Sequence, residues 1–527
     1  MSKAETRELS KTADNPALLE VDSHPVWSTL STPGAGALTL PIIETVLTDF
    51  SQHNISYCYW KSGRRLYSVL TAERDLDLLV AANDQHRAEG ILLARGFKLF
   101  PAMASRDHPS LLSFLGYDES SGRLVHAHLH IRLVVGQQVL KEYHLPWEDV
   151  VLERAVAHSS VPIRMLDPAM EALLLAVRGG LELSRLDAVA LRDWDATTRK
   201  FALDRIHIAA RVDPIALRDL AAELLDEKLG AMVVDVINAD RPLQQQRRFR
   251  RYLARHLAIY RAYNPLEARL RGAWRTVLWL VGNANRHALL VPRPWSRRAP
   301  GGGRVVAIVG VDGSGKTTVT SAIREWLGTE TDVLPIYFGT GDGRPSLLLR
   351  PFKLMVPLVQ RIIGTKPKGA SHGKISDRAP GPLYSTLMMV WALIVAHEKR
   401  GKLLAARRGA DRGLIVLTDR YPQDEIVEFN DGPLLNRLSS VPNWLRRLEA
   451  AAYALSRRLK PDLVIKLDVL PETAARREPD MDPILISRRI ADFRRLTFRG
   501  ARVITVNAEQ PLKDVIRAVK CEIWRLL

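Results

Sequence analysis

Cysteine and long apolar runs are scarce in this chain of 527 residues. Its two cysteines, Cys58 and Cys521, lie near opposite ends, which argues against a disulfide framework or a CxxC metal site and predicts a reducing, cytoplasmic location. The best candidate for a membrane span, residues 383–396, is shorter than the ~18–20 apolar residues that a spanning helix needs, so we expect a buried helix there. The polar start of the chain gives no sign of a signal peptide.

Acidic residues are nearly missing from one segment. Between Arg241 and Arg304 the chain has fifteen arginines and one acid, Glu267, so most of the formal net charge of +18 arises here. Such a segment binds nucleic acid, an anionic membrane surface or an acidic partner, or it is a solvated connector that contacts nothing in particular. The sequence leaves these alternatives open.

The length of the chain predicts about three folded units. Its 46% of apolar and 25% of charged residues are typical of a globular protein. Apolar and polar residues alternate over residues 75–81 and 123–135, which predicts strands, and a helical pattern follows from Pro168. We therefore expect a mobile tail (1–37), an α/β domain (38–165), a helical segment (166–240), a basic connector (241–303) that ends in a Pro/Gly/Arg-rich linker, and a last domain (304–527).

The stretch VVAIVGVDGSGKTTV opens the last domain. It fits the phosphate-binding pattern G-x-x-x-x-G-K-[ST] and stands between an apolar strand and a helix. Backbone N–H groups of the turn and the helix N-terminus would hold the phosphates of ATP. Lys316 would reach the β- and γ-phosphates, and the Thr317 hydroxyl would ligate Mg²⁺. The residues expected around the nucleotide are Gly310, Gly313, Ser314, Gly315, Lys316, Thr317 and Thr318.

Two later segments favour a kinase over other phosphate-binding proteins. The strand GLIVLTDRYP ends at Asp419 and Arg420, where a carboxylate can bind Mg²⁺ or orient an acceptor and an arginine can clamp an acceptor phosphate; the alternative is a local ion pair. Arg476 and Arg477 would close over the transferring phosphoryl group, although at least one of them is expected to be a solvated helix residue. Asn507, at the end of the strand VITVN, marks the place where such folds receive the adenine.

The order VDGSGKTT, TDRY, PDLVIKLDV with its arginine helix, and VITVNAEQPLKDV resembles the thymidylate kinase family over most of residues 304–527. The resemblance implies a P-loop nucleoside-monophosphate-kinase fold, a parallel sheet with helices on both faces. It also implies ATP and Mg²⁺ as cofactors and phosphoryl transfer to a nucleoside monophosphate, with thymidylate (dTMP + ATP to dTDP + ADP) the first candidate. By the same resemblance, Asp312 would contact the acceptor sugar, Arg420 the acceptor phosphate, and Arg476 or Arg477 would be the lid arginine.

Other features depart from that family. It usually has an acidic residue before the first glycine, where this chain has Val309, and the segment YFGTGDGRPS lacks the family's nucleotide-holding motif. The acceptor therefore stays open between a nucleotide and a sugar, glycan or lipid-linked phosphate. A further alternative is a nucleotide-gated binding module with little turnover, and a homodimer is an alternative for the assembly.

The N-terminal region has a pair of carboxylates in the stretch RDLDLLV. Asp75 and Asp77 alternate on one strand and face the same side, which suits a divalent metal in nucleotidyl transfer. The block YWKSGRRLYSVLTAERDLDLLV, followed by ILLARGF, resembles nucleotidyltransferase-fold proteins of an uncharacterised bacterial family, an α+β fold, over roughly residues 40–180.

A third carboxylate would be expected on the later strand of such a fold. Here that strand has His126, His128 and His130, all on one face. These histidines form a zinc site, a polar pocket or a solvated strand face. The domain accordingly catalyses nucleotidyl transfer or only binds a nucleotide or a partner.

Overall fold

The computed structural model describes residues 39–103, 106–108, 110–182, 194–239, 246–286, 290–339, 382–426, 432–437 and 441–527. The tail expected at 1–37 lies outside these ranges. So does most of YFGTGDGRPS, the segment after the first kinase helix on which the acceptor question depends.

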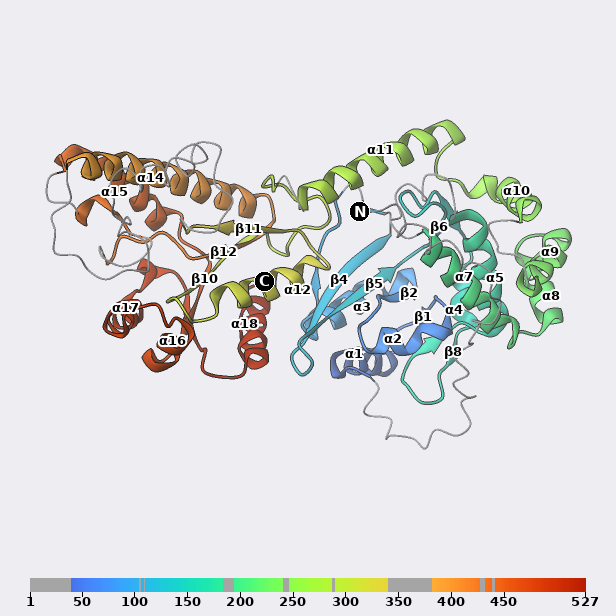
Figure 1. The fold of residues 1–527 in the computed structure, drawn as a ribbon. Helices are drawn as coiled ribbons and strands as arrows, with labels where there is room; N and C mark the ends of the chain where they lie inside the picture. The colour runs from blue at the N-terminus through green and yellow to red at the C-terminus, as the bar shows by residue number, and fades with distance from the viewer. Residues whose placement is uncertain are drawn as a thin grey trace, which may run out of the picture. The chain divides into compact units, whose positions relative to one another are not determined.

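The N-terminal region folds around a seven-stranded mixed sheet with the strand order β3-β4-β5-β2-β1-β9-β8 (Figure 1, blue to cyan). Its strands are β1 (Tyr57–Tyr59), β2 (Leu76–Val80), β3 (Lys98–Leu99), β4 (Leu111–Asp118), β5 (Arg123–His130), β8 (Val156–Ala157) and β9 (Arg164–Met165). The parallel pairing of β2 with β5 sets Asp77 opposite His128, so the acidic and the histidine-rich strands are neighbours.

The strand expected over residues 123–135 is in fact two strands. β5 ends at His130, and β6 (Leu133–Val135) pairs with β7 (Tyr143–Leu145) in a separate two-stranded sheet. The chain changes partner at this point, which the continuous alternation of apolar residues does not reveal. The helices of this region are α1 (Pro41–Gln52), α2 (Leu66–Leu70), α3 (Gln85–Ala94) and α4 (Glu148–Glu153), with short 3₁₀ helices at Gly63–Arg65 and Ala82–Asp84.

A helical region follows, as the sequence predicted. It contains α5 (Pro168–Glu182), α7 (Trp194–Ala209), α8 (Pro214–Leu224), α9 (Glu227–Asn238) and α10 (Arg247–His256). Asp213 and Asp226 cap α8 and α9 by accepting backbone N–H groups of the first turn. Leu253 of α10 packs in the same core as α5, close to Gly180, so the first part of the expected basic connector is built into this helical core.

The rest of the basic segment is also held in place. After the 3₁₀ helix Leu257–Tyr260, helix α11 spans Pro265–Ala284. In the stretch expected to be a linker, the backbone N–H groups of Trp295 and Ser296 both donate to one carboxylate oxygen of Asp332, at 2.7 and 2.6 Å. A carboxylate that accepts two adjacent backbone groups fixes the chain locally, so this stretch is an ordered packing element.

The C-terminal region is built on a five-stranded parallel sheet with the order β11-β12-β10-β13-β14 (Figure 1, yellow to red). Its strands are β10 (Arg304–Gly310), β11 (Val333–Tyr337), β12 (Ile415–Asp419), β13 (Leu463–Asp468) and β14 (Val503–Asn507). Strands covered on both faces are apolar throughout, and Val305–Val309 of the central strand are all buried. The helices are α12 (Lys316–Gly328), α14 (Pro382–Asp411), α15 (Asn443–Arg458), α16 (Pro471–Arg477), α17 (Pro483–Arg495) and α18 (Leu512–Leu526), with 3₁₀ helices at Leu435–Arg437 and Phe498–Gly500.

The central strand β10 is the first of this sheet in the chain and pairs with β12 on one side and β13 on the other. In a parallel sheet of this kind, ligands bind beyond the carboxyl ends of the strands where the order reverses. The turns after β10, β12 and β13 meet at that edge. Residues 383–396 form part of α14, so the expected helix is present, but its burial is partial: Ala392, Val395 and Ala396 are buried and Val390 is 39% exposed. Among the described residues no helix has the length and apolar character needed to cross a bilayer.

Candidate functional site

The turn between β10 and α12 has the backbone that its glycines predict. Gly313 and Gly315 adopt φ of +79° and +84°, a region that disfavours other residues. At Gly310, a Cβ atom would lie 2.3 Å from the Ser314 hydroxyl oxygen, so a side chain there would displace Ser314. The turn can therefore curl tightly enough to point successive backbone groups into one concavity.

The two side chains expected to serve the phosphates and the metal stand at the start of α12. Lys316 is buried, and its Nζ donates to the Val311 carbonyl oxygen at 2.6 Å. Thr317 and its neighbour Thr318 are exposed in the first turn of the helix. The lysine, the exposed hydroxyl and the helix N-terminus together form a donor set that fits a triphosphate with Mg²⁺.

Asp312 lies at the centre of a cluster of cations. Its two carboxylate oxygens accept from Arg420 Nη2 at 3.1 Å and from Arg489 Nη1 at 3.3 Å, and Lys316 Nζ lies 3.6 Å away. The sequence reasoning missed Arg489. Its signal was a second arginine pair, Arg488-Arg489, on the helix that follows the arginine helix.

Arg420 follows the last residue of β12 in a strained conformation. Its φ is +68°, and its backbone N–H donates to the Ile308 carbonyl oxygen of β10 at 3.1 Å. A non-glycine residue in this region stores about 1 kcal/mol or more of backbone strain, which persists only where the surroundings enforce it. Asp419 is buried immediately before it, paired in register with Ile308.

The two arginines of α16 differ in their surroundings. Arg477 Nη1 donates to the Gly313 carbonyl oxygen of the phosphate-binding turn at 3.0 Å, whereas Arg476 Nη2 donates to Thr473 on its own helix at 3.1 Å. Of the pair, the structure brings Arg477 to the turn. Asn507 stands at the exposed end of β14, where its side-chain oxygen accepts from the Glu509 N–H at 2.9 Å.

A second cluster lies on the N-terminal sheet, where Asp75 precedes β2, Asp77 lies on it and three histidines lie on β5. His128 Nδ1 and His130 Nε2 stand 3.3 and 3.1 Å from the same oxygen of Asp77. His126 Nδ1 lies 3.0 Å from Asp75 Oδ1 and 3.0 Å from Glu330 Oε2. The ligand atoms form two overlapping groups within 4.8 Å, Asp75-His126-His128 and Asp77-His128-His130. The two carboxylates do face the side on which the histidines lie.

Burial and hydrogen bonding set the charges of this second cluster. Burial lowers the pKa of His130 to about 3, so its imidazole is neutral. Burial alone would raise the pKa of Asp77, but the charge of Lys61 and the hydrogen bonds from His128 and His130 hold it well below the usual range. Burial also lowers the pKa of His128, whereas hydrogen bonds to Asp75 and Glu330 outweigh burial and raise the pKa of His126. An ionised carboxylate beside the neutral imidazoles of His128 and His130 is a donor set that zinc and similar ions bind.

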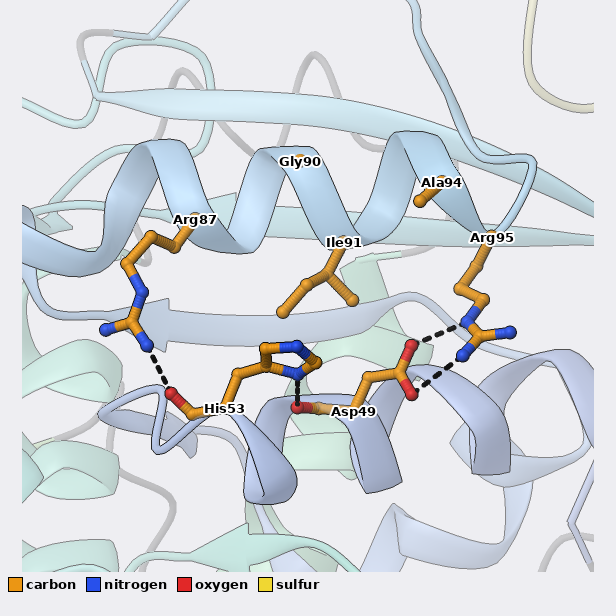
Figure 2. Close-up of a pocket in the computed structure, with 7 residues that line it drawn as sticks. All are labelled: Asp49, His53, Arg87, Gly90, Ile91, Ala94 and Arg95. Atoms are coloured by element: carbon orange, nitrogen blue, oxygen red, sulfur yellow. Dashed lines mark hydrogen bonds and ion pairs between the residues drawn. The ribbon is translucent and has the colours of Figure 1, made fainter.

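The open pocket between α1 and α3 offers less chemistry (Figure 2). It is lined by Asp49, His53, Arg87, Gly90, Ile91, Ala94 and Arg95. Arg95 donates to both oxygens of Asp49, and Arg87 donates to the His53 carbonyl oxygen. Because these groups already satisfy one another, the pocket is an ordinary helix–helix groove.

Comparisons with curated proteins give three similar chains, two of them from Escherichia coli K12, and no family model matches. An uncharacterised ATP-binding protein, YghS of Escherichia coli K12, is 29% identical over 221 residues, which cover 41% of this chain and 90% of that protein. YghR of the same strain, also an uncharacterised ATP-binding protein, is 24% identical over 220 residues, 40% of this chain and 83% of that one. Among solved structures, deoxyadenosine kinase from M. mycoides with bound dATP covers 42% of this chain and 98% of its own, at 15% identity and a TM-score of 0.24, a likeness too weak to support a conclusion.

Proposed function

We propose that residues 304–527 are an ATP- and Mg²⁺-dependent kinase that phosphorylates a nucleoside monophosphate, with thymidylate the first acceptor to test. One observation gives the proposal its main support. Arginines from three separate elements, Arg420, Arg477 and Arg489, contact the phosphate-binding turn or its Asp312. A protein that only binds ATP needs a phosphate cradle, but a kinase also needs cations for the acceptor and for the charge that develops during transfer. The names of the two ATP-binding relatives agree with the cradle.

In this proposal, separate groups of residues bind the donor phosphates, the Mg²⁺ ion and the acceptor phosphate. The turn from Gly310 to Gly315 and Lys316 hold the donor phosphates, while Thr317 and Asp419 would hold Mg²⁺, which neutralises phosphate charge when bound. Arg420 and Arg489 leave Asp312 to clamp the acceptor phosphate. The acceptor oxygen forms a bond to the γ-phosphorus as the bond to ADP breaks, so positioning and charge neutralisation supply the rate enhancement.

The lid assignment favours Arg477 over Arg476. Arg477 already contacts the turn through the Gly313 carbonyl, whereas Arg476 is bonded within α16. We expect Arg477→Ala to lower turnover more than Arg476→Ala does, with both variants folded. Equal losses would remove the distinction.

The experiment that tests the proposal is ADP release by the purified full chain with ATP and Mg²⁺ across a panel of ribo- and deoxyribonucleoside monophosphates. Lys316→Ala serves as the blank, and Arg420→Ala tests the acceptor clamp. Acceptor-dependent release that both substitutions abolish supports a nucleotide kinase. ATP binding without turnover on any nucleotide would overturn it, and a sugar, glycan or lipid-linked phosphate or a nucleotide-gated binding module would then be tested.

A second function is favoured by the Asp/His cluster of the N-terminal sheet. We propose that Asp77, His128 and His130 bind a zinc-class divalent ion. Their ligand atoms lie within 4.8 Å of one another, which is close enough for one ion to contact all three side chains. Three histidines in place of a third carboxylate favour this ion over the Mg²⁺ of nucleotidyl transfer.

The metal proposal is tested by titrating the metal-stripped full chain with Zn²⁺ and with Mg²⁺ in a calorimeter. We expect one zinc site that His130→Gln weakens and that His86→Gln, an exposed histidine on α3, leaves intact. Zinc binding that is unchanged by His130→Gln would place the ion elsewhere. Tight Mg²⁺ binding lost on Asp77→Asn would restore the nucleotidyl-transfer interpretation.

A further inference from the structure

Helix α11 has an outer face made of large apolar side chains. Leu266, Leu270 and Trp274 are 66%, 65% and 62% exposed, and Val277, Leu280 and Val281 are exposed as well. At about 100° per residue, these six positions fall within an arc of about 120°. The small residues exposed in the same arc, Ala273 and Ala284, are apolar too. This apolar arc therefore contains no charged residue, and the exposed Arg269 and Arg271 lie outside it on either side.

The opposite face explains why these side chains stay outside. Ala268, Gly272, Thr276 and Gly282 are buried, and a Cβ atom at Gly282 would lie 2.8 Å from Cβ of Trp295. Small residues let the helix approach the body of the protein closely. Arg275 secures it by donating to the carbonyl oxygens of Asp107 and Val139, at 2.6 and 3.1 Å. Rotation of α11 to bury the large residues would break these contacts, so the apolar face is fixed outward.

The charge around this face indicates what covers it. Glu267 is the only acid between Arg241 and Arg304, and it is paired with Arg271 at 2.8 Å. Arg269 is exposed beside the apolar arc, and four exposed arginines of α10 precede it in the chain: Arg247, Arg248, Arg251 and Arg255. A second copy of the chain would bring arginines against arginines. Nucleic acid would use the arginines and leave the leucines in water. An anionic lipid surface accepts both the apolar side chains and the positive charge.

We propose that α11 is an in-plane membrane anchor: its apolar face, Leu266, Leu270, Trp274, Val277, Leu280 and Val281, enters the headgroup boundary of an anionic bilayer. The arginines of α10 and α11 pair with lipid phosphates. In this mode the helix lies in the plane of the membrane surface and does not cross the bilayer. The proposal does not depend on the kinase or metal assignments, since it uses none of their residues.

The test is flotation of the full chain with vesicles of phosphatidylcholine containing a third phosphatidylglycerol, and with vesicles of phosphatidylcholine alone, at low and high salt. The variant Leu270→Ser/Trp274→Ser changes two exposed side chains and should fold normally, which thermal denaturation checks. The matched control is Trp444→Ser, another tryptophan that is 65% exposed, on α15. We expect salt-sensitive binding to the anionic vesicles only, about tenfold or more weaker in the double variant and unchanged in the control.

Several outcomes would overturn the proposal. Absence of binding to anionic vesicles, equal binding to both vesicle types, or equal binding by the double variant would each do so. A concentration-dependent dimer that the double variant abolishes, without vesicle binding, would identify the face as a contact between two copies. ADP release measured on the same preparations separates these results from a failure of the proposed kinase, because the vesicle assay needs neither ATP nor an acceptor.

Discussion

The two sheets of this chain place their charged residues in different ways. In the C-terminal parallel sheet the candidate site residue Asp419 ends β12, while the cations Lys316, Arg420, Arg477 and Arg489 stand on turns and helices beyond the strand ends. In the N-terminal sheet, Asp77 and the three histidines lie within the strands themselves, on adjacent positions of β2 and β5. The first arrangement collects its cations from three distant parts of the chain, and the second takes its groups from two neighbouring strands.

The difference bears on how each site works. Side chains on turns and short helices can exchange partners, so the cations around Asp312 are able to move onto a ligand. Side chains fixed on paired strands keep their separations, so the Asp/His cluster has a set geometry before anything binds. We infer that the C-terminal site is rearranged by its substrates, whereas the N-terminal cluster selects a ligand by fit.

The largest expected effect comes from Lys316. Lys316→Ala removes the cation of the phosphate-binding turn, and we expect ADP release to fall about 100- to 1,000-fold, with unchanged zinc binding at the N-terminal cluster. Steady-state kinetics check the loss of ADP release, and zinc calorimetry on the same preparation checks the unchanged zinc binding. Loss of zinc binding together with activity would show that the two sites are coupled, which would contradict their description as independent sites.

The converse substitution is His130→Gln. It removes one nitrogen from the rigid cluster, and we expect zinc affinity to fall at least about 100-fold while ADP release is retained. His86→Gln provides the control, since that histidine is on the surface. Should kinase turnover fall in step with zinc affinity, the cluster would serve the kinase rather than a separate function.

The substitution Arg489→Ala tests whether the arginines that contact Asp312 act on the acceptor. Arg489→Ala should lower kcat/KM for the acceptor about tenfold and leave KM for ATP nearly unchanged, because the proposal assigns Arg489 and its partner Asp312 to the acceptor side. Arg488→Ala, an exposed arginine beside it on α17, is the matched control. A larger effect on ATP than on the acceptor would assign Arg489 to the donor side.

A smaller effect concerns the strained backbone of Arg420. Arg420→Ala and Arg420→Gly both remove the guanidinium and should lose activity to the same extent. Only glycine relaxes at φ +68°, so we expect Arg420→Gly to be more stable than Arg420→Ala by about 1 kcal/mol in urea denaturation. Equal stabilities would mean that the loop changes conformation once the side chain is gone.

The smallest effect concerns Asp49 and Arg95, an ordinary ion pair of the N-terminal region that lies apart from the Asp/His cluster. A hydrogen bond from Arg95 lowers the pKa of Asp49 below its usual value, so the pair stabilises the folded state above the unfolded pKa of Asp49 and loses this contribution as the pH falls through the folded value. The difference in unfolding free energy between the native chain and Asp49→Asn should shrink as the pH falls from 6 to 3. A difference that grows toward low pH would contradict the assigned direction.

Local patterns predicted individual elements of the two regions. VVAIVGVDGSGKTTV contains its own strand, turn and helix, so its structure follows from neighbouring residues, and the helix at residues 383–396 was likewise evident. The alternation around Asp77 and the period of two among the histidines also placed these groups correctly on one face.

Features that depend on distant packing were not predictable. Arg489 meets Asp312 across 177 residues of chain, and no local pattern reports that contact. The split of residues 123–135 into two strands follows from a change of partner. The helical spacing of Leu266, Leu270 and Trp274 is visible in the sequence, but a spacing does not say which face is buried. The many arginines around these residues predicted a charged surface, not an apolar one.

The charge cluster around Asp312 has a consequence for selectivity among anions. The carboxylate of Asp312 is an internal counter-ion for Arg420 and Arg489, and Lys316 donates to the Val311 carbonyl oxygen of the same turn. A chloride or a single free phosphate gains little by entering, since it must compete with a partner already in place. A ligand with several phosphates offers enough contacts at once to displace it, so the proposed site would favour polyanionic ligands over abundant small anions before any pocket shape is considered.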